Sequence, residues 1–343
     1  MYGVLRRPEP GGASDGSYDA TAGIQPRTVA PMHEPTDALA APRFTGIRTF
    51  ARLPHVPEID GADAAIFGMP WDGGTSFRSG SRFGPEAIRS ASALLRPYNP
   101  AQNQMVFGHL SCVDAGDAPT VPGYIEETLA RIEQYATGII DRGAVPIGLG
   151  GDHSVALAEL RAIAKKHGPV AYVQVDAHHD LWDSYNGKPY NHGTFAKRAI
   201  EEGLIDPAKS FQGGQRGSLY GPEDYEVAAD LGIKLVPWLE LRQWTPEQFG
   251  QHIKERAGNA PLFLSFDIDF VDPGLCPGTG TPEIGGPSGE QALDLLRALR
   301  GINLVGADVV EVAPQYDSAG QHTALMAANV VYELLTLLAI NKG

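Results

Sequence analysis

Residues 170–180 read Val170-Ala171-Tyr172-Val173-Gln174-Val175-Asp176-Ala177-His178-His179-Asp180, a mostly apolar run that ends in a cluster of acidic and imidazole side chains. A short apolar run with turn residues nearby is typical of a buried strand in a parallel sheet. Ligands of open α/β sheets bind beyond the carboxyl ends of the strands. The cluster therefore predicts a functional site at the end of this strand.

Two further motifs repeat the pattern. Gly150-Gly151-Asp152-His153-Ser154 follows the run 144–149, and Asp267-Ile268-Asp269, with Asp272-Pro273 behind it, follows the run 262–266. Ordinary loop aspartates are the simpler interpretation of any single motif. Three such motifs, each behind its own predicted strand, favour one shared site. Carboxylates gathered there would repel one another unless cations lay among them.

The charge of the set predicts two metal ions rather than one. The candidate ligands, four carboxylates and two neutral imidazoles, are His153, Asp176, His178, Asp180, Asp267 and Asp269. Two divalent ions balance this charge, and bridging carboxylates hold such a pair about 3.5–4 Å apart. One zinc needs only about four ligands and would leave surplus buried charge. The mixed oxygen and nitrogen donors suit Mn²⁺ without excluding Ni²⁺, Co²⁺ or Zn²⁺.

From about Phe50 to Ala339 the chain resembles the ureohydrolases, a family of arginases, agmatinases and related guanidino-compound hydrolases. The resemblance rests on the three motifs above and on segments 68–74 and 78–85, which are similar to the agmatinase side of the family. Segments 277–282 and 311–314 match two further family motifs. The family implies hydrolysis of a C–N bond in a linear amidine, with two divalent metal ions per chain, Ni²⁺ or Mn²⁺.

The resemblance also implies individual roles. His153 and Asp180 would bind one metal, His178 and Asp269 the other, and Asp176 and Asp267 would bridge them. His192 would shuttle protons, and Glu311 would pair with the substrate guanidinium. His192, Glu311 and Asp180 are thus the predicted catalytic residues. The simpler interpretations are an exposed loop histidine and, for Glu311, a buried glutamate with a structural partner.

Hydrolysis of a guanidinium group requires these residue types, independently of the family resemblance. A guanidinium carbon is a poor electrophile, and two metals lower the pKa of bound water so that a bridging hydroxide attacks it near neutral pH. A histidine protonates the leaving amine, and a carboxylate orients the guanidinium by charge-assisted hydrogen bonds. The expected products are urea, or a substituted urea, and an amine or ammonia.

Two departures from the family pattern bear on the substrate. Arginases place an asparagine two positions after the D-A-H-x-D motif, where this chain has Trp182, so arginase activity is not expected. Trp182 is predicted to close the pocket over a small or methylated cation by a cation–π contact, the alternative being that it packs away from the pocket. Gln215 stands where relatives usually carry an apolar residue, and we predict that it contacts substrate. At both positions the chain resembles nickel-using guanidine hydrolases and biguanide (metformin-type) hydrolases.

Three hypotheses follow for the function. The first is a dinuclear-metal hydrolase of a compact guanidino compound such as guanidine, or of a biguanide such as metformin. The second is a Mn²⁺-dependent agmatinase or guanidinobutyrase. The third is a non-catalytic partner subunit of a heteromeric ureohydrolase. The resemblance favours a homotrimer or homohexamer, and a hetero-oligomer with a paralogous subunit is the alternative.

Composition narrows the classes of partner. The net charge of −14 argues against nucleic-acid binding. There is no apolar stretch of 18 residues free of polar groups, and the N-terminus lacks the pattern of a secretory signal, so neither a membrane span nor secretion is expected. Cys112 and Cys276 do not form a metal-binding spacing, and a reducing cytoplasm is the expected location.

Alternating strand and helix patterns predict a three-layer, doubly wound parallel α/β sheet with helices on both faces, as in arginases. Expected helices are 85–95, 125–142, 154–166, 192–202, 289–299 and 323–340, the third of them capped by Ser154. Residues 43–343 are expected to form the catalytic domain. Residues 1–42, rich in glycine and proline, form an N-terminal extension that is either a floppy tail or an arm that wraps a neighbouring subunit.

Overall fold

An eight-stranded parallel sheet forms the centre of the computed structural model, which describes residues 32–56 and 59–343. Its strands lie in the order β4-β1-β5-β10-β9-β6-β7-β8. Their bounds are β1 Ala64–Met69, β4 Cys112–Asp117, β5 Val145–Gly150, β6 Ala171–Val175, β7 Phe211–Gly213, β8 Lys234–Val236, β9 Leu262–Asp267 and β10 Leu304–Val310. A short antiparallel pair, β2 Tyr98–Asn99 and β3 Gln104–Met105, lies apart from this sheet.

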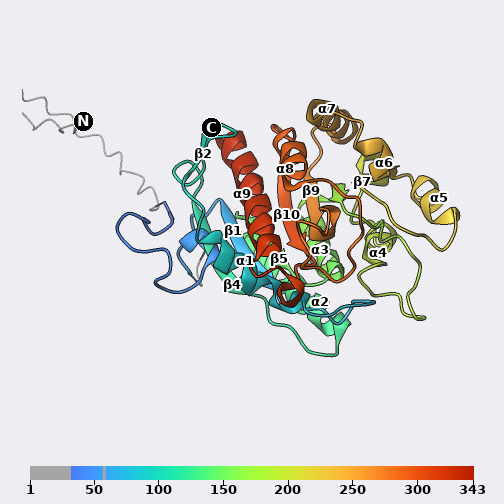
Figure 1. Ribbon diagram of the computed structural model, residues 1–343, viewed down its shortest axis with the longest axis horizontal. Coiled ribbons are helices and arrows are strands. Elements are labelled where there is room, and N and C mark those ends of the chain that lie inside the picture. The colour runs from blue at the N-terminus through green and yellow to red at the C-terminus, as the bar shows by residue number, and fades with distance from the viewer. Residues whose placement is uncertain (1–31, 57–58) are drawn as a thin grey trace, which may run out of the picture. The chain divides into compact units, whose positions relative to one another are not determined.

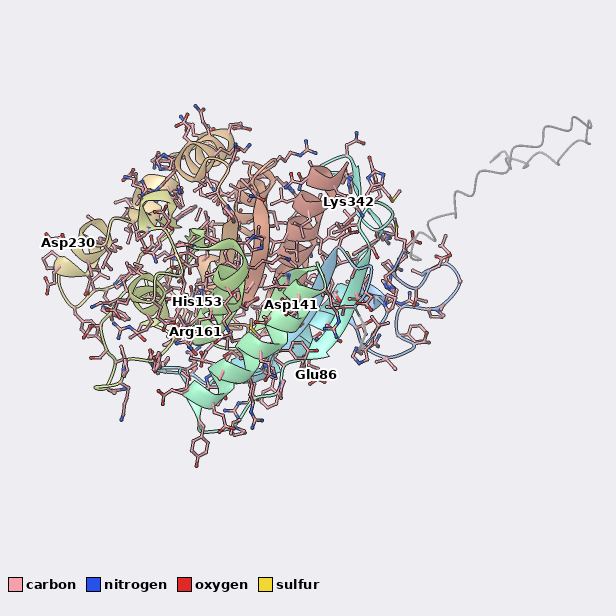
Figure 2. The ribbon with its side chains drawn as sticks, turned by 180° about the vertical axis from the view of Figure 1, so that it is seen from behind. Glu86, Asp141, His153, Arg161, Asp230 and Lys342 are labelled. Carbon is pink, nitrogen blue, oxygen red and sulfur yellow. The ribbon has the colours of Figure 1, made fainter. Side chains whose placement is uncertain are left out.

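Helices cover both faces of the sheet, so the predicted three-layer fold is confirmed. One face is covered by α1 (Gly84–Ser92), α7 (Pro246–Ala257), α8 (Gly289–Arg297) and α9 (His322–Lys342), with α1, α8 and α9 in front of the strands in Figure 1. The other face is covered by α2 (Ile125–Asp141), α3 (Ala156–His167), α4 (Phe195–Glu201) and α5 (Glu223–Asp230). In the view from behind, α2 ends at the labelled Asp141 and α3 carries the labelled Arg161 (Figure 2).

Side chains alternate along each strand between two hydrophobic cores, one on each face of the sheet. In β6, Ala171, Val173 and Val175 pack in the core on the α9 face, while Tyr172 packs on the α3 face. Successive side chains of a strand point to opposite faces, so a strand buried on both sides is apolar almost throughout. This is why the apolar runs identified in the sequence form central strands.

Two helix starts differ from the sequence expectation: α4 begins at Phe195 and not at residue 192, and α3 is preceded by a short 3-10 helix. Ser154 lies inside a short 3-10 helix, His153–Val155, and Asp152 is its capping residue because the Asp152 carboxylate accepts a hydrogen bond from the Ser154 backbone N–H. Helix α7 was not among the expected helices, although Thr245 and Gln248 form a capping box at its start. Helix α6 (Trp238–Leu241) is a single turn.

Among the described residues, α9 alone is long and apolar enough to cross a membrane by length and composition. Within its most apolar stretch, 78% of the residues are buried inside the protein. The helix packs against α1, α8 and β10. Its apolar composition is therefore accounted for by its place in the core.

The start of the described chain is tied to the sheet. The His33 carbonyl accepts a hydrogen bond from Cys112 N, and Thr36 N donates to the Arg52 carbonyl. The predicted boundary at residue 42 stays a prediction. Residues 1–31, which make up most of the predicted arm, lie outside the described residues.

Candidate active site

The three motifs converge because their strands are neighbours. Strands β5, β10, β9 and β6 lie side by side, and their carboxyl ends meet at one edge of the sheet. His153 follows β5, Asp176 follows β6, and Asp267 is the last residue of β9. The sheet thus gathers side chains that lie far apart in the sequence.

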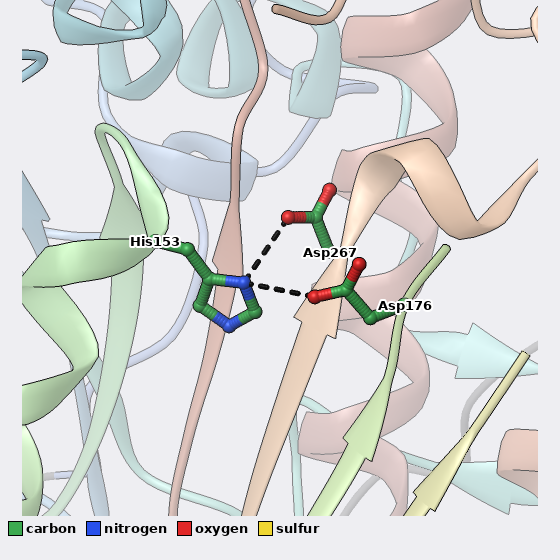
Figure 3. A group of neighbouring side chains, drawn as sticks. All are labelled: His153, Asp176 and Asp267. Atoms are coloured by element: carbon green, nitrogen blue, oxygen red, sulfur yellow. Dashed lines mark ion pairs between the residues drawn. The ribbon is translucent and has the colours of Figure 1, made fainter. Parts of the chain in front are cut away.

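One ligand group is centred on His153. Its Nδ1 atom lies 3.0 Å from Asp176 Oδ2, 3.1 Å from Asp180 Oδ2 and 3.1 Å from Asp267 Oδ2. Figure 3 shows this nitrogen pointing between Asp176 and Asp267. His153 and Asp180 are brought together here, as the family resemblance implies.

Hydrogen bonds on the far side of the His153 ring decide which of its two nitrogens carries the proton. The other nitrogen, which faces the carboxylates, is then an acceptor. The Ser265 hydroxyl donates to Asp308 Oδ1 at 2.6 Å, so its oxygen accepts from His153 Nε2 at 2.7 Å. The neutral ring therefore carries its proton on Nε2, and Nδ1 presents a buried lone pair that no donor satisfies. A lone pair facing three carboxylate oxygens fits a metal cation.

A second group is centred on His178. Its Nδ1 lies 3.1 Å from Asp269 Oδ2 and 3.5 Å from Asp176 Oδ1. Asp176 thus belongs to both groups, with one oxygen turned to each. Asp267 contacts the first group through Oδ2, while its Oδ1 accepts a hydrogen bond from Asp269 N at 2.8 Å. A bridging role for Asp267 remains a prediction.

The electrostatics of the cluster also favour a cation. Burial and the neighbouring Asp176 raise the pKa of Asp180 to about 6. Burial and Asp269 raise the pKa of Asp267 well above its ordinary range. Burial lowers the pKa of His153, but hydrogen bonds with Asp176, Asp180 and Asp267 outweigh it and hold that pKa well above its ordinary range. Without a metal, the cluster would take up protons to offset its charge.

A row of polar side chains crosses the sheet beneath the two groups. Gln212 of β7, Gln174 of β6, Ser265 of β9 and Asp308 of β10 are partners in register on adjacent strands, and all are fully buried. Gln174 Nε2 donates to Asp176 Oδ2 at 2.6 Å and to Asp180 Oδ2 at 3.2 Å. The row was missed in the sequence, although each member is a polar residue inside an otherwise apolar run. It orients the ligands from below.

The row continues at Gly148 of β5, which is the register partner of Asp308. A Cβ atom at Gly148 would lie 2.6 Å from Glu159 Oε2, so the missing side chain makes room for the Glu159 carboxyl of α3. Burial and the neighbouring Asp308 raise the pKa of Glu159 well above its ordinary value. Two buried acids side by side share one proton rather than carry two charges.

His192 and Glu311 form a pair beside the ligand groups. His192 Nδ1 lies 2.9 Å from Glu311 Oε1, and the Ser76 backbone N–H donates to His192 Nε2 at 3.1 Å. Neutral His192 therefore carries its proton on Nδ1, and this N–H donates a hydrogen bond to Glu311. Burial lowers the pKa of His192, but Glu311 and the charges of Asp152 and Asp180 raise it above its ordinary value. Ser76, which touches this ring, was not identified from the sequence.

Glu311 itself is 1% exposed and lies behind His192 rather than on the pocket wall. Oε1 accepts from His153 N at 3.0 Å as well as from His192, whereas Oε2 is buried without a partner. Glu311 and Asp180 both have positive φ, at 64° and 52°, which is uncommon for residues with a Cβ and is often found at functional sites. The contact with a substrate guanidinium stays a prediction, and the orientation of His192 by Glu311 is what the structure shows.

A pocket of about 260 Å³ opens over the ligand groups. Its lining residues are Ser76, His153, His178, Asp180, Trp182, Tyr185, His192, Gly193, Ser218, Leu219, Tyr220, Asp267, Thr281 and Glu283. Trp182 is on the wall, as one of the two interpretations of this residue expects. No Lys or Arg lines this pocket within the described chain.

Gln215 does not join Trp182 on the wall. It is 2% exposed, and its Nε2 donates to the His178 carbonyl at 3.2 Å. The amide therefore supports the loop that carries His178 instead of facing the pocket. The sequence identified the residue, but its direction is set by the strand β7 that precedes it.

Comparison with known proteins gives the family. Residues 62–336 match the model of the Arginase family. The chain belongs to the arginase family. It is 44% identical to a guanidinobutyrase of Pseudomonas aeruginosa over 90% of this chain and 97% of the relative, and 40% identical to a mitochondrial agmatinase of Gallus gallus over 93% and 94%. The solved structure of proclavaminate amidinohydrolase from Streptomyces clavuligerus matches with a TM-score of 0.84 at 39% identity, covering 88% of this chain and 100% of that one.

This arginase-family chain is accordingly a hydrolase that acts on C–N bonds of guanidino compounds, and the predicted agmatinase-like side of the family is confirmed. The guanidinobutyrase and agmatinase names fit the second functional hypothesis at least as well as the first. They refer neither to guanidine itself nor to metformin, so the narrower substrate stays a prediction. The two ligand groups are the candidate metal site of the family fold.

Proposed function

We propose that the protein hydrolyses a C–N bond of a small guanidino compound, guanidine or a biguanide such as metformin, with two divalent ions, Ni²⁺ or Mn²⁺, in the His153 and His178 groups. The observation that carries the proposal is the sharing of Asp176 by both groups beneath a pocket that His192 also lines. When bound, the two ions would supply an activated water as nucleophile and neutralise the carboxylates.

The side chains supply the remaining steps. His192 lines the pocket and has a raised pKa, so it carries a proton toward the leaving nitrogen. Glu311 fixes the ring through Nδ1 and stabilises its charged form. The bound ions would neutralise Asp180 and Asp267, so the negative charge of Glu283 on the pocket wall is left to attract a cationic substrate.

A compact substrate is supported by the size and lining of the pocket. The cavity measures about 260 Å³, and none of its described lining residues is a Lys or Arg that could pair with the carboxylate of a guanidino acid. Guanidine and biguanides carry no carboxylate and need no such partner.

The second candidate is agmatinase or guanidinobutyrase activity with Mn²⁺. This candidate is favoured by the names of the similar proteins. Agmatinase activity is favoured also by Glu283 on the pocket wall, which would pair with the distal ammonium group of agmatine. The third candidate is a partner subunit of a hetero-oligomer, and a homotrimer or homohexamer is the proposed assembly otherwise.

The test is turnover by purified protein loaded separately with Mn²⁺ and Ni²⁺, with metal content measured on the same sample. The substrates are guanidine, metformin, agmatine and 4-guanidinobutyrate, and the readouts are urea or substituted urea and the released amine or ammonia. Hydrolysis of guanidine or metformin supports the proposal. Hydrolysis of agmatine or 4-guanidinobutyrate alone supports the second candidate, and no hydrolysis at full metal occupancy supports the partner-subunit role.

A further inference from the structure

A second cavity lies at the far end of helix α1 from the candidate active site. Helix α1 begins at the active-site edge, where a Cβ atom at Gly84 would lie 2.6 Å from the Val312 carbonyl oxygen, and it ends at Ser92. The cavity, here called the Arg52 cavity, measures about 500 Å³, a size that suits a small molecule. Its wall is formed by residues from the segments 34–43, 51–52 and 93–97, with Phe107.

Three arginines line the Arg52 cavity: Arg43, Arg52 and Arg96. Arg52 is 9% exposed, and neither its buried Nη1 atom nor the buried Nε atom of Arg43 has a hydrogen-bond partner within residues 32–56 and 59–343. The arginine ion pairs of that part of the chain involve other arginines. A guanidinium keeps its charge in a protein, and burying it without an acceptor is unfavourable. The cavity therefore presents positive charge that lacks a partner.

The backbone at Arg52 has an uncommon conformation. Ala51 and Arg52 have φ angles of 50° and 62°, in the left-handed region that residues with a Cβ rarely adopt. Two buried side chains fix this turn, because Asp114 Oδ2 accepts from Phe50 N at 2.7 Å and Ser92 Oγ accepts from Ala51 N at 2.7 Å. Strain of this kind persists only where the surrounding structure determines it, and it often accompanies a binding site. The turn carries Arg52 into the cavity wall.

The rest of the lining decides the kind of ligand. Two acidic residues on the wall, Glu34 and Asp37, are exposed, and Asp37 Oδ1 already accepts from Leu39 N at 2.8 Å. The three arginines outnumber these acids, so the cavity favours an anion. The small excess of positive charge suits a singly charged carboxylate better than a phosphate dianion. Most other lining residues are apolar, among them Phe107, which is 4% exposed.

We propose that the Arg52 cavity binds a small organic carboxylic acid, with its carboxylate on Arg52 and Arg43 and its apolar body against Phe107. A guanidinium matches a carboxylate through parallel charge-assisted hydrogen bonds. Arg96 is exposed and adds positive charge, and its carbonyl accepts from the Tyr332 hydroxyl at 2.7 Å, which ties this part of the wall to α9. The site shares no lining residue with the pocket over the ligand groups. Its occupation is therefore independent of which guanidino compound is hydrolysed.

The test uses full-length, metal-loaded protein with hexanoate as the probe and hexanamide as its neutral analogue. Ligand-observed NMR titration in chloride buffer gives the two dissociation constants. Hexanoate should bind at least about 10-fold more tightly than hexanamide, because the amide cannot form the charge-assisted hydrogen bonds. Binding of both compounds with equal strength, or of neither, overturns the proposal.

Three variants locate the bound hexanoate. Arg52→Met keeps an unbranched apolar stem without the charge and should weaken binding by about 10-fold or more. Glu34→Gln removes a negative charge from the wall and should tighten binding by about two- to fivefold. Arg242→Met, at an exposed arginine after α6 and outside the cavity, should leave the dissociation constant unchanged. Hexanoate bound at the metal ligands would not respond to Arg52→Met, so unchanged binding in that variant overturns the proposal.

The stability of the protein without hexanoate gives a second measurement. An unpaired buried charge is destabilising, so Arg52→Met should raise the Tm of the unliganded protein and abolish the rise in Tm that hexanoate produces in the wild type. Differential scanning calorimetry measures both effects. If Arg52 instead pairs with a carboxylate of a neighbouring subunit, Arg52→Met should lower the Tm and hexanoate should leave the wild-type Tm unchanged. That result would overturn the proposal.

Discussion

Asp176 is the residue on which both ligand groups depend, because its two oxygens face His153 and His178 separately. Asp176→Asn keeps the shape and removes the charge. We expect metal content to fall from two ions per chain to one or fewer and turnover to fall by about 100-fold or more, given what loss of even a supporting partner costs a metal site. Elemental analysis of the purified variant and its activity are the measurements.

The matched control is Asp183→Asn, three positions beyond Asp180. The Asp183 side chain is 75% exposed and pairs with Lys197 at the surface. This variant should keep two ions and the wild-type rate. If Asp176→Asn also kept two ions and full activity, a shared-ligand role for Asp176 would be ruled out.

His192 is expected to act on protons and not on metal. In His192→Asn the metal ligands are intact, so both ions should remain bound while kcat falls by about 10²–10⁴-fold, the usual contribution of general acid–base catalysis. Steady-state kinetics and metal analysis of one preparation measure both quantities. Unchanged kcat would remove His192 from the mechanism.

At the scale of secondary structure, the polar row across β7, β6, β9 and β10 ends in the buried acids Asp308 and Glu159. The folded protein holds the pKa of Glu159 well above its ordinary value of 4.5 through burial and Asp308. A folded pKa above the unfolded one favours folding at pH below 4.5 and loses that contribution as the pH rises toward the folded pKa.

Glu159→Gln removes this titration while keeping the shape of the neutral side chain. The variant should therefore gain stability relative to the wild type as the pH rises above 4.5. The gain is at most about 1.4 kcal/mol per pH unit, the slope for one proton. Urea unfolding between pH 5 and 8 measures it, with the exposed Glu86→Gln as control. A constant difference across this range would contradict a protonated Glu159.

At the scale of the whole molecule, bound metal is expected to be part of the stability. A ligand that binds only the folded state adds about 4 kcal/mol at a concentration of 1,000 times its Kd. Removal of metal with a chelator should lower the Tm, and reloading should restore it, as measured by calorimetry. An unchanged Tm after confirmed metal loss would contradict this expectation.

Metal affinity should also depend on pH in a defined direction. The raised pKa of His153 means that a proton competes with metal at Nδ1, so affinity should fall as the pH falls. The chelator concentration needed to remove half of the metal should be lower at pH 6 than at pH 8.

The predicted N-terminal arm can be tested through the oligomeric assembly of the protein. Residues 33 and 36 make backbone hydrogen bonds to the body of the chain, so the informative deletion is 1–31 and not a longer one. If the extension wraps a neighbouring subunit, this deletion should lower the mass of the particle in solution, measured by light scattering. An unchanged mass would contradict the arm and favour a tail.

Local sequence was sufficient for the fold class and for naming the metal-ligand candidates, although helices α5 and α7 were not expected from it. Short apolar runs such as 170–175 bury their side chains as strands that are covered on both faces of the sheet. The residues directly after such a strand lie at its carboxyl end. The types of those residues then restrict the chemistry, since carboxylates and imidazoles gathered in a buried place need a cation.

Tertiary structure alone decided which way those side chains face and what joins them there. Gln215 and Glu311 were both identified in the sequence, yet Gln215 turns to the His178 carbonyl and Glu311 turns to His192. Ser76 and Tyr220 gave no local signal, because they reach the pocket on loops from other parts of the chain. Asp224 gave none either, and it reaches Trp182 from the first turn of α5. The direction of a side chain depends on register and on neighbours distant in sequence, and only the folded sheet brings those neighbours together.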